Sequence, residues 1–387
     1  MVKVSKSQAL VLVTLFVTWL YNYVQFLGLF TELKYTDGAC NLVAPTGMVG
    51  SEDFCIGKHS NVFISQGDLH NCFIHGSFSA SPGHIWFVNM KRKILPQKAI
   101  IENFPPGYRF QPHGIYVSNS TDLLYAVNHA QNYSGIEVFG IDYSDSPSSV
   151  TLKHLFTIKS NLFELYSIND VVEGAEKGEI FVTKWLPYGY PAGGKLHPVT
   201  PQERAKLGWA LPINLMGMKF TNLYRCTWDE STGETECSVP KGTEKFGMAN
   251  GITTSSDRTH IFVNDVVFKM IHVYNRGDPN DKTTLSKAHP IKLDFMGDNI
   301  EFDPVTEEII YGSIPLPYVP VLNDLKKNYN EHKVVPGGMG VISPEFTISH
   351  PILHDGTKLS QISAASRYGN TVLLGSPFSN GILVCQI

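Results

Sequence analysis

A strand–turn–strand unit recurs six times along the chain, and this repeat constrains the fold more than any other feature. Each unit opens with a small polar or charged cluster, followed by a short apolar strand, a turn and a second strand. The clusters start at Ser51, His113, Asn169, Asn250, Asp298 and Ser363, and the second strands start at Asn61, Leu123, Glu179, His260, Glu308 and Thr371. Successive clusters lie roughly 50 to 80 residues apart, which is typical of propeller blades. We therefore predict an all-β, six-bladed β-propeller over residues 33–387.

The longest interval between clusters runs from Asn169 to Asn250. It contains residues 185–194, which are rich in Pro and Gly and have little strand character. Long connections in compact folds are often binding loops or lids. We expect a lid-like insertion around 185–220 over one mouth of the central channel.

Residues 1–32 differ in composition from the rest of the chain. An apolar run over 9–30 follows Lys3 and Lys6, and its length is about the ~20 residues that cross a bilayer. Ala9 is its only alanine, so it lacks a small-residue cleavage site. We predict a hydrophobic helix retained as a signal anchor in a membrane or lipid surface, with the body extracellular or lumenal. The alternative is a signal peptide cut at an atypical site, which would give a secreted form.

The cysteines indicate an oxidising compartment. Their number is even and no Cys-x-x-Cys spacing of a zinc site occurs, which favours disulfides. They are Cys40, Cys55, Cys72, Cys226, Cys237 and Cys385. Cys226 and Cys237 flank a turn-like segment and are placed to pair across a hairpin.

Closure of the ring requires the first and last strands to meet, because an open propeller exposes two strand edges. Cys40 precedes the first unit and Cys385 ends the last, so a bridge between them would fasten the ring. The alternative is that Cys40 pairs with Cys55 or Cys72. If the closing bridge forms, Cys55 is left to pair with Cys72.

Charge and motifs exclude several functions. The formal net charge is -4 and the pI is near 6.4, so no basic field is present to hold a nucleic acid. The chain has no Gly-x-Ser-x-Gly elbow, zinc-protease motif, phosphate loop or dinucleotide fingerprint. Sequons at Asn119 and Asn132 predict a glycosylated surface.

The polar clusters predict a metal centre. If each cluster opens the innermost strand of its blade, all of them gather at one end of the channel, where buried charge needs a partner. Their oxygen-bearing residues are Glu52, Asp53, Asn169, Asp170, Asn250, Asp298 and Asn299. Carboxylate and amide oxygens suit a hard cation, and calcium accepts six to eight flexible ligands more readily than magnesium.

Several stretches resemble the paraoxonase family, in order and over nearly the whole chain. They are Gly50-Ser-Glu-Asp, Pro112-His-Gly-Ile, Val127-Asn-His, Asn169-Asp-Val-Val, Ala249-Asn-Gly-Ile, Asp298-Asn-Ile-Glu-Phe-Asp-Pro and the C-terminus from Leu373 to Cys385. The resemblance implies two calcium ions in the channel, together with the Cys40–Cys385 bridge and a retained hydrophobic N-terminus. It assigns one ion to Glu52, Asn169, Asn250, Asp298 and Asn299, and a deeper, structural ion to Asp53, Asp170 and the carbonyl of Ile115.

The same resemblance assigns His113 and His129 to a His dyad that serves hydrolysis of small-molecule lactones and aryl esters. A physical argument supports His113, because an unperturbed pKa of ~6.5 lets a histidine accept a proton from water near pH 7. His113 lies beside the proposed calcium ligands in the repeat, and His129 is placed to orient it. We therefore predict a calcium-dependent hydrolase.

One segment departs from the family pattern. Where the family usually continues its strand with Asn-Asp-His, this chain has Thr183, Lys184, Trp185 and Leu186, so the acid expected to support the second histidine is absent. This departure leaves an alternative function open. The chain would then be a membrane-tethered binding protein or chaperone that keeps calcium for stability and acts on a partner membrane protein.

Overall fold

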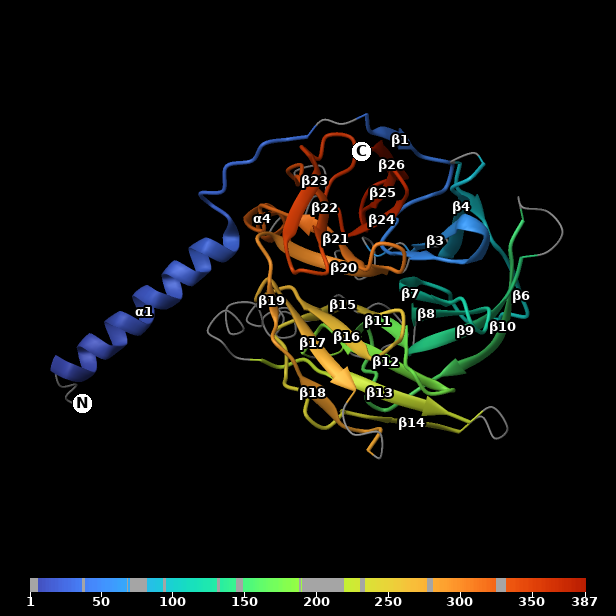
Figure 1. Ribbon diagram of the computed structural model, residues 1–387, viewed down its shortest axis with the longest axis horizontal. Coiled ribbons are helices and arrows are strands. Elements are labelled where there is room, and N and C mark those ends of the chain that lie inside the picture. Colours follow the sequence, from blue (N-terminus) through green and yellow to red (C-terminus); the bar gives the residue numbers. More distant parts are fainter. Residues whose placement is uncertain are drawn as a thin grey trace.

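Six sheets, antiparallel except for one short edge strand, surround a central axis in the computed structural model of the protein (Figure 1). The structure describes residues 6–36, 39–67, 69, 82–92, 95–130, 133–143, 149–187, 189, 219–229, 234–276, 281–324 and 332–387. Each of the six predicted strand–turn–strand units forms the two inner strands of one sheet. The prediction of a six-bladed β-propeller is confirmed.

The blades follow one another in chain order. The first contains β2 (Phe54–Ile56), β3 (Asn61–Gln66), β4 (His84–Asn89) and β5 (Gln97–Lys98), with the 3-10 turn η1 (Lys58–Ser60) between β2 and β3. The second contains β7 (Pro112–Ser118), β8 (Leu123–His129), β9 (Ser134–Asp142) and β10 (Thr151–Ile158), with β6 (Ile100–Glu102) parallel to β10. The third contains β11 (Ile168–Glu173), β12 (Glu179–Lys184), β13 (Leu223–Trp228) and β14 (Thr235–Ser238).

The remaining three blades have the same plan. The fourth contains β15 (Ala249–Thr254), β16 (His260–Asp265), β17 (Met270–Arg276) and β18 (Leu285–Lys287), with β19 (Ile291–Lys292) also paired to β17. The fifth contains β20 (Met296–Asp303), β21 (Glu308–Ile314), β22 (Gly337–Ile342) and β23 (Ile348–His354), and α4 (Tyr318–Asp324) follows β21. The sixth contains β24 (Ala364–Tyr368), β25 (Thr371–Gly375), β26 (Ile382–Gln386) and β1 (Asn41–Val43).

The core lies between blades, which explains why the inner strands are apolar on both faces. Successive side chains of a strand point to opposite faces of its sheet. On β3, Val62 and Ile64 pack in a cluster that contains Leu373 of the sixth blade, whereas Phe63 packs in a cluster that contains Leu124 of the second. Every blade is therefore covered on both faces by its neighbours.

The N-terminal segment closes the ring. Strand β1 pairs antiparallel with β26, and Asn41 lies opposite Val384. A disulfide joins Cys40 to Cys385 next to this pairing, and a second joins Cys226 to Cys237 across β13 and β14. Both predicted bridges are confirmed.

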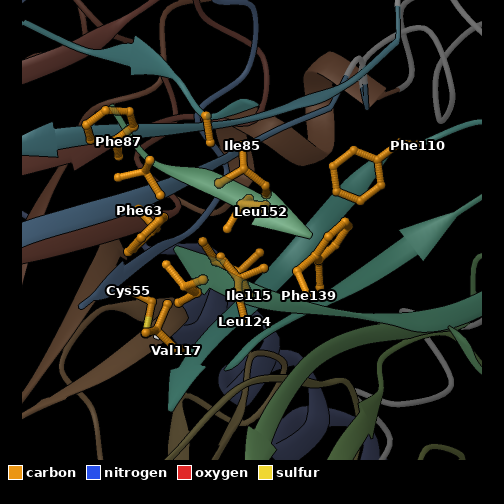
Figure 2. Close-up of a cluster of buried hydrophobic side chains, with 14 residues drawn as sticks. Cys55, Phe63, Ile85, Phe87, Phe110, Ile115, Val117, Leu124, Phe139 and Leu152 are labelled. Carbon is orange, nitrogen blue, oxygen red and sulfur yellow. Dashed lines mark hydrogen bonds between the residues drawn. The ribbon is translucent and has the colours of Figure 1, made fainter. Parts of the chain in front are cut away.

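The predicted pairing of Cys55 with Cys72 is wrong. Cys55 is a buried free thiol, and its Sγ accepts a hydrogen bond from the backbone N–H of Val117 at 3.1 Å. Figure 2 shows it at the edge of the buried cluster that also holds Phe63 and Ile115. Burial, followed by the negative charge of Glu301, raises the pKa of the thiol, because both disfavour the thiolate. Cys72 lies outside the described residues.

Helix α1 (Lys6–Leu27) projects from the disc of blades (Figure 1). Its last residues, Phe26 and Leu27, are buried against the propeller. Gly28 then turns the chain with φ +69°, and a Cβ there would lie 2.6 Å from the carbonyl oxygen of Pro315. Among the described residues, no helix combines the length and apolar character needed to cross a bilayer. The predicted lid around 185–220 falls mostly on 188 and 190–218, which are outside the described part of the chain.

We expect loss of the closing bridge to destabilise the fold more than loss of the hairpin bridge. Cys40–Cys385 spans 345 residues of sequence and Cys226–Cys237 spans 11, and a bridge restricts the unfolded chain more when its loop is longer. Replacing both cysteines of the closing bridge by alanine should cost about 6 kcal/mol, against about 3 kcal/mol for the hairpin pair. Denaturant unfolding under non-reducing conditions measures both. An equal or smaller loss for the closing bridge would contradict this role.

Candidate functional site

The same irregularity occurs in the innermost strand of four blades. In β7, β11, β15 and β20, two residues of the inner strand lie opposite one residue of its neighbour, so one extra residue is inserted. The residues within these bulges are His113 and Gly114, Asn169 and Asp170, Asn250 and Gly251, and Asp298 and Asn299. A bulge redirects side chains that would otherwise alternate between sheet faces. All the predicted ligands of these four strands, except the carbonyl of Ile115, lie in bulges.

Two bulges need glycine because neighbouring inner strands touch there. A Cβ on Gly114 would lie 2.3 Å from Oδ1 of Asp170, and a Cβ on Gly251 would lie 2.6 Å from the backbone nitrogen of Ile300. Such distances are too short for any side chain. The close approach brings the polar residues of adjacent blades together at the axis.

Glu52 is the centre of the polar cluster. The Nδ2 of Asn299 donates to both the backbone oxygen and Oε1 of Glu52, each at 2.8 Å. The Oγ of Ser363, from the sixth blade, also donates to the backbone oxygen of Glu52 at 2.8 Å. His113 Nε2 lies 3.4 Å from Glu52 Oε1 and 3.4 Å from Asn169 Nδ2. Residues of five blades therefore meet at this point.

Asn250 and Asp298 belong to the same cluster. Burial, followed by the negative charge of Glu52, raises the pKa of Asp298 well above its usual range, and a hydrogen bond from Asn250 opposes this shift. The structure thus brings together the five residues predicted to hold the first ion: Glu52, Asn169, Asn250, Asp298 and Asn299.

Four oxygens of this cluster are buried without a hydrogen-bond partner among the described residues. They are Oε2 of Glu52 and the Oδ1 atoms of Asn169, Asn250 and Asn299. An unpaired buried polar atom costs about 1–3 kcal/mol, so four in one place require an explanation. They are the donor type that a hard cation takes. In the described ranges, no three His, Cys, Asp or Glu side chains form a metal-binding group, and this cluster instead combines two carboxylates with three amides.

Asp53 and Asp170 form a second polar level of the channel. Asp53 accepts the N–H of Ile115 in the next blade at 2.8 Å, and Asp170 accepts the N–H of Ile252 in the next blade at 2.9 Å. Burial raises the pKa of both carboxyls well above the usual range. For Asp53 the negative charge of Asp170 adds to this shift, and for Asp170 backbone hydrogen bonds oppose it. A bound cation would relieve this repulsion.

Beyond the two aspartates, the channel widens into a cavity of about 280 Å³. Later residues of the innermost strands line it, including Ile115, Val117 and Glu301. Burial raises the pKa of Glu301 to about 8. The cavity and the Glu52 cluster therefore lie on opposite sides of Asp53 and Asp170 along the channel.

The two predicted histidines are in direct contact. His113 Nδ1 lies 2.9 Å from His129 Nε2, and both rings are buried. Burial, followed by the effect of His113, lowers the pKa of His129 well below its usual value, which keeps this ring neutral near pH 7. Trp185 packs edge-on against His113, with ring centroids 5.9 Å apart.

The residues at the position of the missing acid are engaged elsewhere. The Oγ1 of Thr183 accepts the backbone N–H of Asp170 at 3.1 Å, and buried Lys184 pairs with Glu164 at 3.1 Å. The partner of His129 is instead Ser134, whose Oγ lies 3.1 Å from His129 Nδ1. Sequence reasoning missed Ser134, although it lies directly across the β8–β9 hairpin from His129.

The two sequons remain predictions. Asn119 is exposed, and its Nδ2 donates to the backbone oxygen of Ile56 at 3.2 Å. Asn132 lies outside the described residues.

These features define a class of protein: a six-bladed propeller that buries oxygen donors and a histidine pair at one end of its central channel. The family model described as "Arylesterase" matches residues 34–186 and 235–387. Serum paraoxonase/lactonase 3 of Oryctolagus cuniculus is 31% identical over 340 residues, which cover 85% of this chain and 84% of the relative. Serum paraoxonase/arylesterase 1 of Mus musculus is 27% identical over 358 residues, which cover 90% and 88%. The chain belongs to the arylesterase (paraoxonase) family.

We expect Gly114→Ala to disturb the hub, meaning the polar residues that the innermost strands bring together at the channel axis. Its added methyl group would meet Asp170 Oδ1 at 2.3 Å, and such overpacking costs about 1–3 kcal/mol. Gly140→Ala is the matched control, because a Cβ at that position on β9 has its nearest neighbour at 3.9 Å. Thermal unfolding of both variants provides the comparison. Similar melting temperatures for the two would show that the inner strands do not need this close contact.

Proposed function

We propose that this protein is a calcium-dependent hydrolase of lactones and aryl esters. Two findings support the proposal: membership of a family whose relatives are named for arylesterase and lactonase activities, and the group of four unpaired buried oxygens at one end of the channel. The second finding carries most weight, because it is a property of this chain itself. The substrate would be a small molecule that reaches the mouth of the channel.

The residues present fit calcium. Glu52, Asn169, Asn250, Asp298 and Asn299 would hold one ion, and Asp53, Asp170 and the carbonyl of Ile115 would hold a second. Each aspartate oxygen of the deeper level already accepts one N–H, and a carboxylate oxygen has a further lone pair for a cation. Bound calcium would supply Lewis-acid polarisation of a substrate carbonyl or phosphoryl oxygen.

His113 would act as the general base. Its Nε2 faces Glu52 and Asn169, so a neutral ring with a free Nε2 lone pair accepts a proton from the attacking water. His129 holds the other ring nitrogen of His113 at 2.9 Å and fixes the orientation of the ring. Trp185 packs edge-on against the His113 ring and would help to hold it in place.

Two observations support the alternative function, a membrane-tethered binding protein or chaperone. Lys184, which pairs with Glu164, stands in the segment where the family pattern has an acid, and the two matched parts of the family model leave out residues 187–234. A chain that binds calcium for stability, is tethered to a membrane and assists a membrane protein would tolerate both changes. The activity measurements below separate the two functions.

Attachment to a lipid surface is proposed through helix α1. The exposed face of the helix carries large apolar side chains, among them Leu10, Phe16 and Val17, which are 67%, 59% and 56% exposed. An exposed apolar surface of this kind favours burial in lipid or against a partner. The proposal puts the propeller on the extracellular or lumenal side of that membrane, with a secreted form as the alternative.

Hydrolysis of phenyl acetate and of an aliphatic lactone by the purified full-length protein tests the catalytic proposal. We expect activity with calcium and none after chelation. Asn250→Ala should lower activity by roughly 10–100-fold or more through loss of a ligand, and His113→Gln by about 10²–10⁴-fold through loss of the base. Asn370→Ala, an exposed turn residue, is the control and should retain full activity. Equal activity with and without chelator would refute calcium dependence.

Thermal unfolding tests calcium binding independently of activity. A ligand specific to the folded state stabilises it by about 2.7 kcal/mol at a hundredfold excess over Kd. The melting temperature should therefore rise with calcium in the unmodified protein and rise less in Asn250→Ala. A calcium-stabilised protein without any hydrolase activity would favour the binding function. No response to calcium would overturn both functions.

A further inference from the structure

A buried chain of hydrogen bonds supports the histidine pair. The backbone N–H of Tyr166 donates to Ser134 Oγ at 2.8 Å, and Ser134 Oγ lies 3.1 Å from His129 Nδ1. His129 Nε2 lies 2.9 Å from His113 Nδ1. Ser134, His129 and His113 are 3%, 0% and 4% exposed. Every N–H and O–H hydrogen in this row of hydrogen bonds therefore needs an acceptor from the protein.

Ser134 restricts the direction in which these hydrogen bonds are donated. A serine hydroxyl has one hydrogen to donate and two lone pairs to accept with, and Tyr166 occupies one lone pair. If Ser134 donates to His129 Nδ1, the hydroxyl hydrogen is satisfied. If His129 donates to Ser134 instead, the hydroxyl hydrogen has no acceptor among the described residues, because Ser134 Oγ contacts only Tyr166 and His129 there.

We propose that Ser134 is a positioning residue that sets the histidine pair in one direction, with Ser134 as the donor. His129 then carries its hydrogen on Nε2 and donates it to His113 Nδ1. His113 in turn carries its hydrogen on Nε2, which lies 3.4 Å from Glu52 Oε1, an acceptor, and also 3.4 Å from Asn169 Nδ2, which is a donor and cannot accept it. A carboxylate in place of Ser134 has no hydrogen and would impose the opposite direction.

Donation in the direction from Ser134 to His113 slows catalysis. This consequence rests on the proposed function. The base form of His113 needs a free Nε2, so both imidazoles must first move their hydrogens from Nε2 to Nδ1 and the Ser134 hydroxyl must turn away. No proton is gained or lost in this rearrangement. An orphaned buried donor lowers the population of the reversed state by a factor of roughly 5–150. The protein should therefore hydrolyse esters more slowly than the same site with an acid behind His129.

Nitrogen NMR of the full-length protein labelled with ¹⁵N-histidine tests the direction without relying on activity. With calcium present and at mildly alkaline pH, we expect His129 to show a protonated Nε2 and a bare Nδ1, with assignments from His129→Gln and His113→Gln. Ser134→Thr keeps the hydroxyl and should keep this pattern, whereas Ser134→Asp should reverse it. A wild-type His129 with its hydrogen on Nδ1 would overturn the proposal, and this spectrum decides even if the aspartate variant does not fold.

Kinetics test the catalytic consequence. With an aliphatic lactone, Ser134→Asp should raise kcat by roughly 5–150-fold and leave KM unchanged, because the substituted residue lies behind the dyad and away from the substrate. A reversed NMR pattern without a gain in kcat would refute the link between direction and rate. Absence of hydrolysis in every variant, with the expected NMR pattern, would refute the proposed function and leave the assigned direction intact.

Discussion

The one-residue bulge repeated in β7, β11, β15 and β20 is the constraint on which the rest of the site depends. A regular inner strand would point alternate residues into the two neighbouring blades, where apolar packing is required. The bulge releases two consecutive residues from that alternation, so polar groups reach the axis without disturbing the core. Gly114 and Gly251 make this possible by letting adjacent inner strands touch. The fold thus obtains a polar centre without sacrificing its interblade packing.

Burying several carboxylates close together at the hub costs electrostatic free energy, and the same carboxylates belong to the candidate site. Burial and mutual repulsion raise the pKa values of Asp53, Asp170 and Asp298, and several oxygens nearby have no hydrogen-bond partner. The same aspartates join blades, since Asp53 accepts from Ile115 and Asp170 from Ile252. A cation at this position would therefore act on two properties at once. It would stabilise the contact between blades and hold the groups that face a substrate.

The overall fold could be predicted from the sequence because every blade has the same local pattern, a polar cluster followed by two short apolar strands. Six polar clusters before six strand pairs were sufficient to predict the blades, and the resemblance identified which oxygens meet. The role of Ser134 could not be predicted, because it depends on the register of one hairpin and on a backbone N–H from Tyr166, 32 residues away. The pairing of Cys55 failed for a related reason. Counting cysteines ignores side-chain direction, and Cys55 points into the core between two blades.

The attachment of α1 fixes which side of the disc the helix belongs to. It is held by Lys269, which donates to the backbone oxygen of Gln25, and by the close approach of Gly28 to Pro315. Lys269 follows the end of β16, which pairs with the start of β15, and Pro315 follows the end of β21, which pairs with the start of β20. Those starts carry Asn250 and Asp298. A surface that took up the helix would therefore meet the propeller at the end where the innermost strands β15 and β20 start.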